Sequence, residues 1–168
     1  MNDFFNKSDL SRKDAENIVS EALNNCDDGE LYLENSKSES IVLDDNKIKS
    51  SSYSSDLGYG LRAVTDEVVA YSHSNEISKV SLKQSSENLY STLKSKKGTY
   101  NHAITKTNEK IYKDINPIEE KSLNSKLDLL KEINNYTRAK GTIVRQVTAS
   151  FAGEHKSVEI IRSGGEVL

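Results

Sequence analysis

The chain has 168 residues and a mass of 18.7 kDa, which is enough for one domain or slightly more. Charged residues make up 29% of it, but the net charge is only −3 and Lys and Arg form no cluster, so we expect no direct contact with nucleic acid. No apolar run approaches the roughly 20 residues that cross a bilayer, and the N-terminus lacks the apolar core of a secretory signal. These features predict a cytoplasmic protein with no membrane partner.

The first predicted element is an amphipathic helix over residues 11–26. Its apolar residues recur at helical spacing along one face, and they are Ala15, Ile18, Val19, Ala22 and Cys26. Ser11, with Asp14 three residues later, is expected to cap its start. Cys26 is the only cysteine and lies on the apolar face, so it is predicted to be a buried small side chain and not a nucleophile.

Alternating apolar residues then predict two successive hairpins. The first begins with Leu31 and Leu33 and turns at residues 44–47. The second begins with a strand in which Leu57, Tyr59, Leu61 and Ala63 share one face, while Gly58, Gly60, Arg62 and Val64 share the other. Residues 65–67 turn the chain into a strand over 68–73, and Asn75 is the predicted N-cap of a helix over 76–93.

The later part of the chain begins with a lysine-rich stretch without a regular period, which predicts a surface connection. Ser122 is the expected N-cap of the helix that follows, and strands over 142–152 and 157–161 are predicted to be joined by a turn at 153–156. A further turn is expected at 163–165. We therefore divide the chain into an α+β domain over residues 1–97, a linker over 98–121, and a helix plus an incomplete β region over 122–168.

Together these elements predict an α+β fold, in which helices pack on one face of a twisted, mainly antiparallel sheet that is followed by the start of a second β-rich region. The hydrophobic content of 35% is low for a self-contained domain. A last strand beginning at Glu166 would be cut after three residues. Both features favour a sheet that is completed by a partner or by further sequence.

The segment from Glu39 to Ser78 resembles the TldD/PmbA family in the order and spacing of its features. These are a strand, an acidic turn, a second strand, the Gly-x-Gly-x-Arg strand at residues 58–62, an aromatic-containing strand, and a helix that opens near Ile77 and Ser78. The resemblance covers roughly residues 31–168. It implies a subunit of a zinc-dependent peptidase that acts on peptides, pairs with itself or with a paralogous subunit, and is historically grouped with modulators of DNA gyrase.

The resemblance implies a zinc site built on a helical His-Glu-x-x-x-His element in the later part of the family's chain, and these 168 residues do not contain that element. The histidines are His73, His102 and His155, and none is spaced to form a ligand set with another. We therefore expect no catalytic residue, no metal ligand and no cofactor in this chain. Zinc is expected in the C-terminal part of the family, which is absent here.

Gly58, Gly60 and Arg62 are the candidate site residues. Glycine weakens a strand, so two glycines on one face predict the close approach of another backbone, either a packed helix or an extended peptide substrate. Arg62 shares that face, and we expect it either to pair with an acid such as Glu39 or to steer a peptide carbonyl or carboxylate.

The resemblance thus predicts the N-terminal, non-catalytic portion of a TldD-like zinc metallopeptidase subunit, which contributes to dimer assembly and to the peptide-substrate chamber. Two alternatives stay open at this point. The chain can be part of a non-catalytic paralogous partner subunit, or a stand-alone protein-interaction module.

Overall fold

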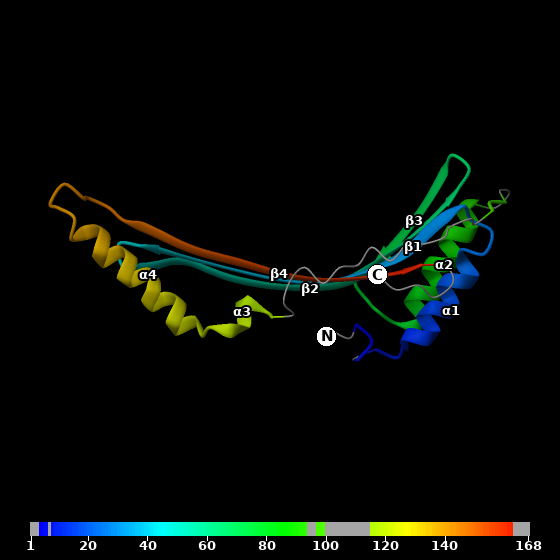
Figure 1. The fold of residues 1–168 in the computed structure, drawn as a ribbon, viewed down its shortest axis with the longest axis horizontal. Coiled ribbons are helices and arrows are strands. Elements are labelled where there is room, and N and C mark those ends of the chain that lie inside the picture. The colour runs from blue at the N-terminus through cyan, green and yellow to red at the C-terminus, as the bar shows by residue number, and fades with distance from the viewer. Residues whose placement is uncertain (1–3, 7, 94–96, 100–114, 163–168) are drawn as a thin grey trace. The chain divides into compact units, whose positions relative to one another are not determined.

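The structure, a computed structural model, describes residues 4–6, 8–93, 97–99 and 115–162 (Figure 1). In chain order its elements are α1 (Arg12–Ala22), β1 (Asp28–Asp44), β2 (Lys47–Thr65), β3 (Val68–Ser74), α2 (Lys79–Leu93), α3 (Pro117–Glu120), α4 (Leu123–Arg138) and β4 (Thr148–Arg162). Residues 100–114 of the predicted linker, the predicted turn at 163–165 and the strand expected from Glu166 lie outside the described residues.

The four strands form one sheet in the order β3-β2-β1-β4. β2 and β3 pair antiparallel, and in their register Gly60 lies opposite His73 while Arg62 lies opposite Tyr71. One helix precedes the first three strands, and three helices separate β3 from β4 along the chain. The predicted α+β class with a twisted antiparallel sheet is therefore confirmed.

The hairpin between β1 and β2 turns at Asp45 and Asn46, whose φ angles are +47° and +64°. Positive φ at both central residues is typical of a type I′ turn, and the short polar side chains of Asp and Asn tolerate it better than most. The next hairpin turns at Asp66, where φ is +52°. The turns predicted at 44–47 and 65–67 are therefore confirmed.

The chain divides into two compact units that each combine separate stretches of sequence. Unit 1 contains Met1–Asn35, Asp56–Tyr112 and Ser157–Leu168, and unit 2 contains Ser36–Ser55 and Lys113–Lys156. β1, β2 and β4 each contribute residues to both units, so unit 2 is itself rich in β structure. The predicted boundaries at residues 97 and 121 follow the order of the chain, whereas the compact units do not.

Unit 1 has a core between its helices and one face of its strands. Ser11 caps α1 as predicted, because its hydroxyl accepts a hydrogen bond from the backbone N–H of Asp14 at 3.1 Å. The buried cluster combines residues of both helices with inward residues of the strands, among them Ala15, Val19, Leu82, Leu89, Leu31, Leu33, Tyr59, Leu61 and Ala63. The Tyr59 hydroxyl also lies 2.8 Å from Ser81 Oγ and 2.9 Å from Ser85 Oγ of α2. The alternate residues of the same strands therefore point away from the helices.

Several elements differ from the sequence-based expectation: α1 ends at Ala22 and not at Cys26, and the strand predicted from residue 142 begins at Thr148. Helix α2 begins at Lys79 and not after Asn75, because Ile77 is buried in the core and the first free N–H groups of the helix bond to Asp9 and to the Ser78 hydroxyl. The turn predicted at residues 153–156 is wrong, since β4 runs without interruption from Thr148 to Arg162. A single glycine in this segment does not end the strand, because side-chain burial keeps its two-residue alternation through it.

Unit 2 packs α4 against its strands through Leu130, which forms a buried cluster with Ile41, Leu43 and Ala149. The side chain of Lys126, also on α4, is only 5% exposed. Its ammonium group pairs with the Glu39 carboxylate, donates to the Ile118 carbonyl at 2.6 Å and lies 5.6 Å from the centre of the Phe151 ring. A buried lysine is stable here because all these groups compensate for its lost hydration.

Candidate functional site

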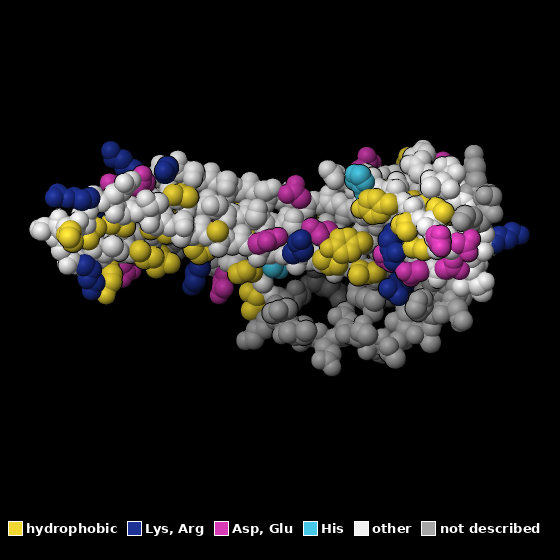
Figure 2. Space-filling model, turned by 90° about the horizontal axis from the view of Figure 1, so that it is seen from above, with side chains coloured by type: hydrophobic (Ala, Val, Ile, Leu, Met, Phe, Trp, Pro, Cys, Tyr) yellow, Lys and Arg dark blue, Asp and Glu magenta, His cyan; other side chains and the backbone are white. Residues whose placement is uncertain are grey.

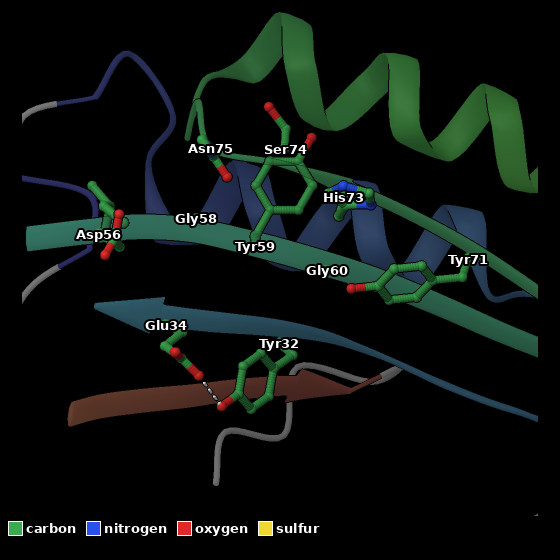
Figure 3. Close-up of a pocket in the computed structure, with 11 residues that line it drawn as sticks. Tyr32, Glu34, Asp56, Gly58, Tyr59, Gly60, Tyr71, His73, Ser74 and Asn75 are labelled. Carbon is green, nitrogen blue, oxygen red and sulfur yellow. Dashed lines mark hydrogen bonds between the residues drawn. The ribbon is translucent and has the colours of Figure 1, made fainter. Parts of the chain in front are cut away.

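The face of unit 1 that points away from α1 and α2 carries a shallow groove, which we call the trough (Figure 3). It has a volume of about 250 Å³. Its lining residues come from three neighbouring strands and the segment after β3, and they are Tyr32, Glu34, Asp56, Leu57, Gly58, Tyr59, Gly60, Tyr71, His73, Ser74 and Asn75. The trough is thus a product of strand pairing and not of any single loop.

Gly58 and Gly60 of β2 form the floor of the trough, between side chains of β1 on one side and of β3 on the other (Figure 3). A Cβ at Gly60 would lie 2.5 Å from Tyr71 Oη, and a Cβ at Gly58 would lie 2.9 Å from the Ser74 carbonyl oxygen. Both distances are shorter than normal van der Waals contact. Any side chain at either position would therefore fill the trough or displace its wall.

The walls are aromatic. Tyr71 and His73 project from β3 on the same side, and their rings stack with centroids 5.7 Å apart and planes inclined by 27°. Tyr32 stands on the β1 side (Figure 3). The exposed fraction of Tyr71 is 64% and that of Tyr32 is 36%, so both rings can contact a bound molecule. Stacked and exposed aromatic rings of this kind supply flat surfaces for a planar or cationic group.

The trough is acidic at the end where Glu34 and Asp56 lie. The Tyr32 hydroxyl donates a 2.6 Å hydrogen bond to Glu34 Oε2, and this bond, with burial and the carboxylate charge, raises the pKa of Tyr32 to about 12. Tyr32 is therefore neutral at physiological pH. No Lys or Arg occurs among the described residues that line the trough. On the surface of this unit a histidine and acidic side chains lie beside a group of hydrophobic side chains (Figure 2).

Arg62 follows the two glycines on the same face, but it does not line the trough. Its Nε donates to Glu30 Oε1 at 2.6 Å and its Nη2 to Glu30 Oε2 at 2.8 Å, while Nη2 also lies 2.6 Å from Asp28 Oδ2. The prediction that Arg62 pairs with Glu39 is wrong, because the Glu39 carboxylate pairs with Lys126. The bond to Glu30 is the main cause that raises the pKa of Arg62. Burial acts to raise the pKa of Asp28, but the hydrogen bond and charge of Arg62 outweigh it and the pKa is lowered.

The two glycines have β3 and the segment after it as neighbours, and neither packs against a helix. By the alternation along β2, both glycines lie on the face opposite to Tyr59 and Leu61, which belong to the core that includes the helices. Sequence reasoning singled out the floor but missed the walls, namely Tyr32, Glu34, Asp56 and Tyr71. The available signal was their position in the alternation, which places each of them on the outward face of its strand.

The described residues do not fit a catalytic zinc site. Within that part of the chain, no group of three or more His, Cys, Asp or Glu side chains is placed to hold a metal ion. Cys26 is buried and burial raises the pKa of its thiol, which keeps it protonated. Among the helices that the structure describes, none is long and apolar enough to cross a membrane.

Comparison with known proteins shows which family this chain belongs to. The family model for PmbA/TldA metallopeptidase domain 1 matches residues 29–95. The Metalloprotease TldD homolog of Buchnera aphidicola from Acyrthosiphon pisum is 34% identical over 143 residues, and that of Haemophilus influenzae is 32% identical over 144 residues. Each alignment covers 84% of this chain and 30% of the relative. The chain thus spans less than a third of the length of these relatives.

Solved structures share the fold at low sequence identity. A candidate modulator of DNA gyrase from Bacteroides thetaiotaomicron aligns with a TM-score of 0.66 at 17% identity, over 94% of this chain and 37% of that one. TldE from Thermococcus kodakarensis aligns with a TM-score of 0.59 at 16% identity, over 92% of this chain and 36% of that one. The matched domain, the curated relatives and the shared fold agree, and the chain belongs to the PmbA/TldD metallopeptidase family.

Proposed function

We propose that this chain is the N-terminal, non-catalytic portion of a TldD-like zinc metallopeptidase subunit of the cytoplasm. In this role it contributes the trough to the chamber that holds peptide substrates, and it takes part in assembly with a second copy or a paralogous subunit. Zinc, which would polarise a peptide carbonyl and activate water, belongs to a part of the family's chain that is not in this sequence.

One observation carries the proposal: the residues that the family model matches include every residue that lines the trough. The match covers residues 29–95, and the lining residues extend from Tyr32 to Asn75. Metallopeptidase is the activity that the description of the matched domain names. A groove with a glycine floor and aromatic walls supports a role in holding peptide, because glycine lets another backbone approach closely.

The first test is chemical. The purified chain is equilibrated with zinc and desalted, and its metal content and its cleavage of an unstructured peptide are measured beside a full-length TldD homologue as the positive control. We expect neither stoichiometric zinc nor turnover from the chain alone. Tight zinc at one ion per chain together with peptide cleavage would refute a non-catalytic role.

The second test concerns assembly. Sedimentation velocity of the chain, alone and mixed with a TldE-type relative from the same organism, is expected to reveal self-association or a mixed complex. Titration with unstructured peptides, followed by the backbone amide signals of Gly58 and Gly60, measures the binding role separately. A chain that stays monomeric with every relative, and whose glycine signals no peptide moves, would instead be a stand-alone module.

A further inference from the structure

We propose that the free edge of β3, together with the flank of α2 beside it, pairs with the same surface of a second copy of this chain. We call this surface the β3–α2 edge, and it consists of the strand Val68–Ser74 and the helix residues Val80, Gln84 and Asn88. A twofold axis perpendicular to the sheet would relate the two copies and join their sheets. This inference rests on the proposed function, because it names the surface and the partner of the assembly role.

The backbone of β3 is open to another strand. β3 is an outer strand of the sheet, and among the described residues β2 is the strand that pairs with it (Figure 1). A two-residue turn joins them at Thr65 and Val68, and the residues that flank such a turn exchange both backbone hydrogen bonds. Bonding to β2 then alternates along β3, so the N–H and C=O groups of Val69, Tyr71 and His73 point to the free side. These groups can pair with an antiparallel strand.

β3 lacks the features that usually keep an exposed edge strand from pairing. Its sequence, VVAYSHS, contains no proline, glycine, lysine or acidic residue. Val69 and Tyr71 are 59% and 64% exposed. Native proteins protect such an edge with charges, proline or a bulge, or they cover it. Because β3 has no residue that repels a partner strand, the edge is built to be covered.

The flank of α2 beside this edge is also nearly free of charge. A groove of about 360 Å³ lies between them, and its lining residues are Ser72, His73, Ser74, Glu76, Val80, Ser81, Gln84, Ser85 and Asn88. Of these described lining residues, Glu76 is the one acid, and none is Lys or Arg, although 29% of the chain is charged. Elsewhere on α2, Lys79 pairs with Asp14 of α1. Depletion of charge is typical of the centre of a protein–protein interface.

The position of α2 allows the helix layer to continue together with the sheet. Ser85 Oγ lies 2.9 Å from the Tyr59 hydroxyl of β2 and 3.0 Å from Ser72 Oγ of β3, so α2 lies above the space between these strands. Neighbouring strands are about 4.8 Å apart, which places α2 about 5 Å from a twofold axis beside β3. The two α2 helices would then be about 10 Å apart, close to the ordinary spacing of packed helices.

These two layers favour a second copy over an isolated peptide strand. A peptide would satisfy the backbone groups of β3 but would bring no second helix to the flank of α2. Pairing of β3 with itself places Tyr71 opposite its counterpart and Val69 opposite His73 of the other copy. Aromatic and β-branched cross-strand pairs of this kind stabilise a sheet. The side-chain amides of Gln84 and Asn88 both donate and accept hydrogen bonds, so they suit a surface that meets itself.

The test uses the 168-residue chain in sedimentation velocity over a concentration range of about two orders of magnitude. We expect a reversible equilibrium between monomer and dimer. Amide hydrogen exchange, measured by NMR at both ends of the range, should reveal protection that rises with concentration at Val69, Tyr71 and His73. Protection at Ala70 and Ser72, whose backbone groups point to β2, should not change with concentration.

Two variants locate the interface and one is a matched control. Tyr71→Lys places a charge on the edge strand, and Gln84→Glu places like charges on the two facing helix flanks. Each should weaken the dimer Kd at least about tenfold. Tyr90→Lys changes a tyrosine of α2 that is 74% exposed and does not line the groove, and should leave the Kd unchanged. Far-UV circular dichroism checks that all three variants fold.

Several results would overturn the inference. It fails if the chain stays monomeric over the whole range, if a dimer forms without protecting Val69, Tyr71 and His73, or if Tyr71→Lys and Gln84→Glu both keep the full affinity. A dimer through another surface, or a mixed complex with the TldE-type relative alone, would leave the assembly role of the proposed function standing. Protection that appears only when an unstructured peptide is added would identify the edge as a peptide site, which refutes the second copy but supports the peptide-holding role.

Discussion

Replacement of Gly60 by alanine tests how the trough is built, because the neighbour that the new methyl group would meet is a movable side chain. The Cβ would lie 2.5 Å from Tyr71 Oη and 3.0 Å from the nearest ring carbons of Tyr71. Tyr71 is 64% exposed, so its ring can swing outward into solvent. The variant should therefore fold, but with a changed wall.

The magnitude follows from two opposing effects. Moving Tyr71 from its preferred rotamer costs roughly 0.5–1.5 kcal/mol at most. Alanine stabilises by about 0.4–1 kcal/mol relative to glycine, because it restricts the unfolded chain where the backbone conformation is accessible to it. Gly60 has no positive φ that would oppose alanine. The free energy of unfolding should therefore change by no more than about 1 kcal/mol.

Gly29→Ala is the matched comparison, because its neighbours cannot move. The Cβ would lie 2.5 Å from Leu23 Cδ2, a fully buried side chain, and 2.6 Å from the carbonyl oxygen of Arg62. Overpacking of this kind costs about 1–3 kcal/mol. Urea unfolding followed by far-UV circular dichroism measures both variants. If Gly60→Ala loses as much stability as Gly29→Ala, the assignment of Tyr71 as a movable wall is refuted.

Three further predictions test other parts of the chain. Leu130→Ala removes a side chain that is 1% exposed and should cost about 2–5 kcal/mol, whereas Leu129→Ala, at the next position and 48% exposed, should stay within about 0.5 kcal/mol in the same urea assay. Lys126→Met leaves the Glu39 carboxylate, whose side chain is 11% exposed, without its partner and should cost about 3–5 kcal/mol. The double variant with Glu39→Leu should recover much of that loss; an equally unstable double variant would contradict the ion-pair account. Asp27 accepts hydrogen bonds from two backbone N–H groups, and these bonds lower its pKa below the ordinary 3.8. Its contribution to stability is therefore present above pH 3.8 and is lost as the pH falls through the lowered pKa. Asp27→Asn should flatten this loss of stability in urea midpoints measured between about pH 2.5 and 6.

Local features of this fold could be predicted from the sequence, because neighbouring residues determine them. The cap of α1 at Ser11 depends on a residue three positions away, and the turn at Asp45 and Asn46 depends on the tolerance of these residues for positive φ. Alternation along β2 also separated the buried Tyr59 and Leu61 from the outward glycines. Each of these signals lies within a few residues of the feature that it predicts.

Features that depend on strand register could not be predicted in the same way. The walls of the trough come from β1 and β3, and only the pairing of these strands with β2 brings Tyr32 and Tyr71 to the two sides of Gly60. The same dependence on strand register explains why Glu39 was predicted as the partner of Arg62 in place of Glu30. Glu39 and Glu30 are both acids of β1, and the sequence contains no measure of which one lies beside Arg62 in the sheet.

The Gly-x-Gly-x-Arg strand combines two independent sets of residues, because its side chains alternate between the two faces of the sheet. The inward set, with Tyr59 and Leu61, packs against the helices and determines whether unit 1 folds. The outward set leaves a groove at Gly58 and Gly60, and beyond the groove it places Arg62 in ion pairs with acids of β1. The glycines and the arginine therefore serve different ends on one face: the glycines leave open space above the strand, and Arg62 ties β2 to β1 through its ion pairs.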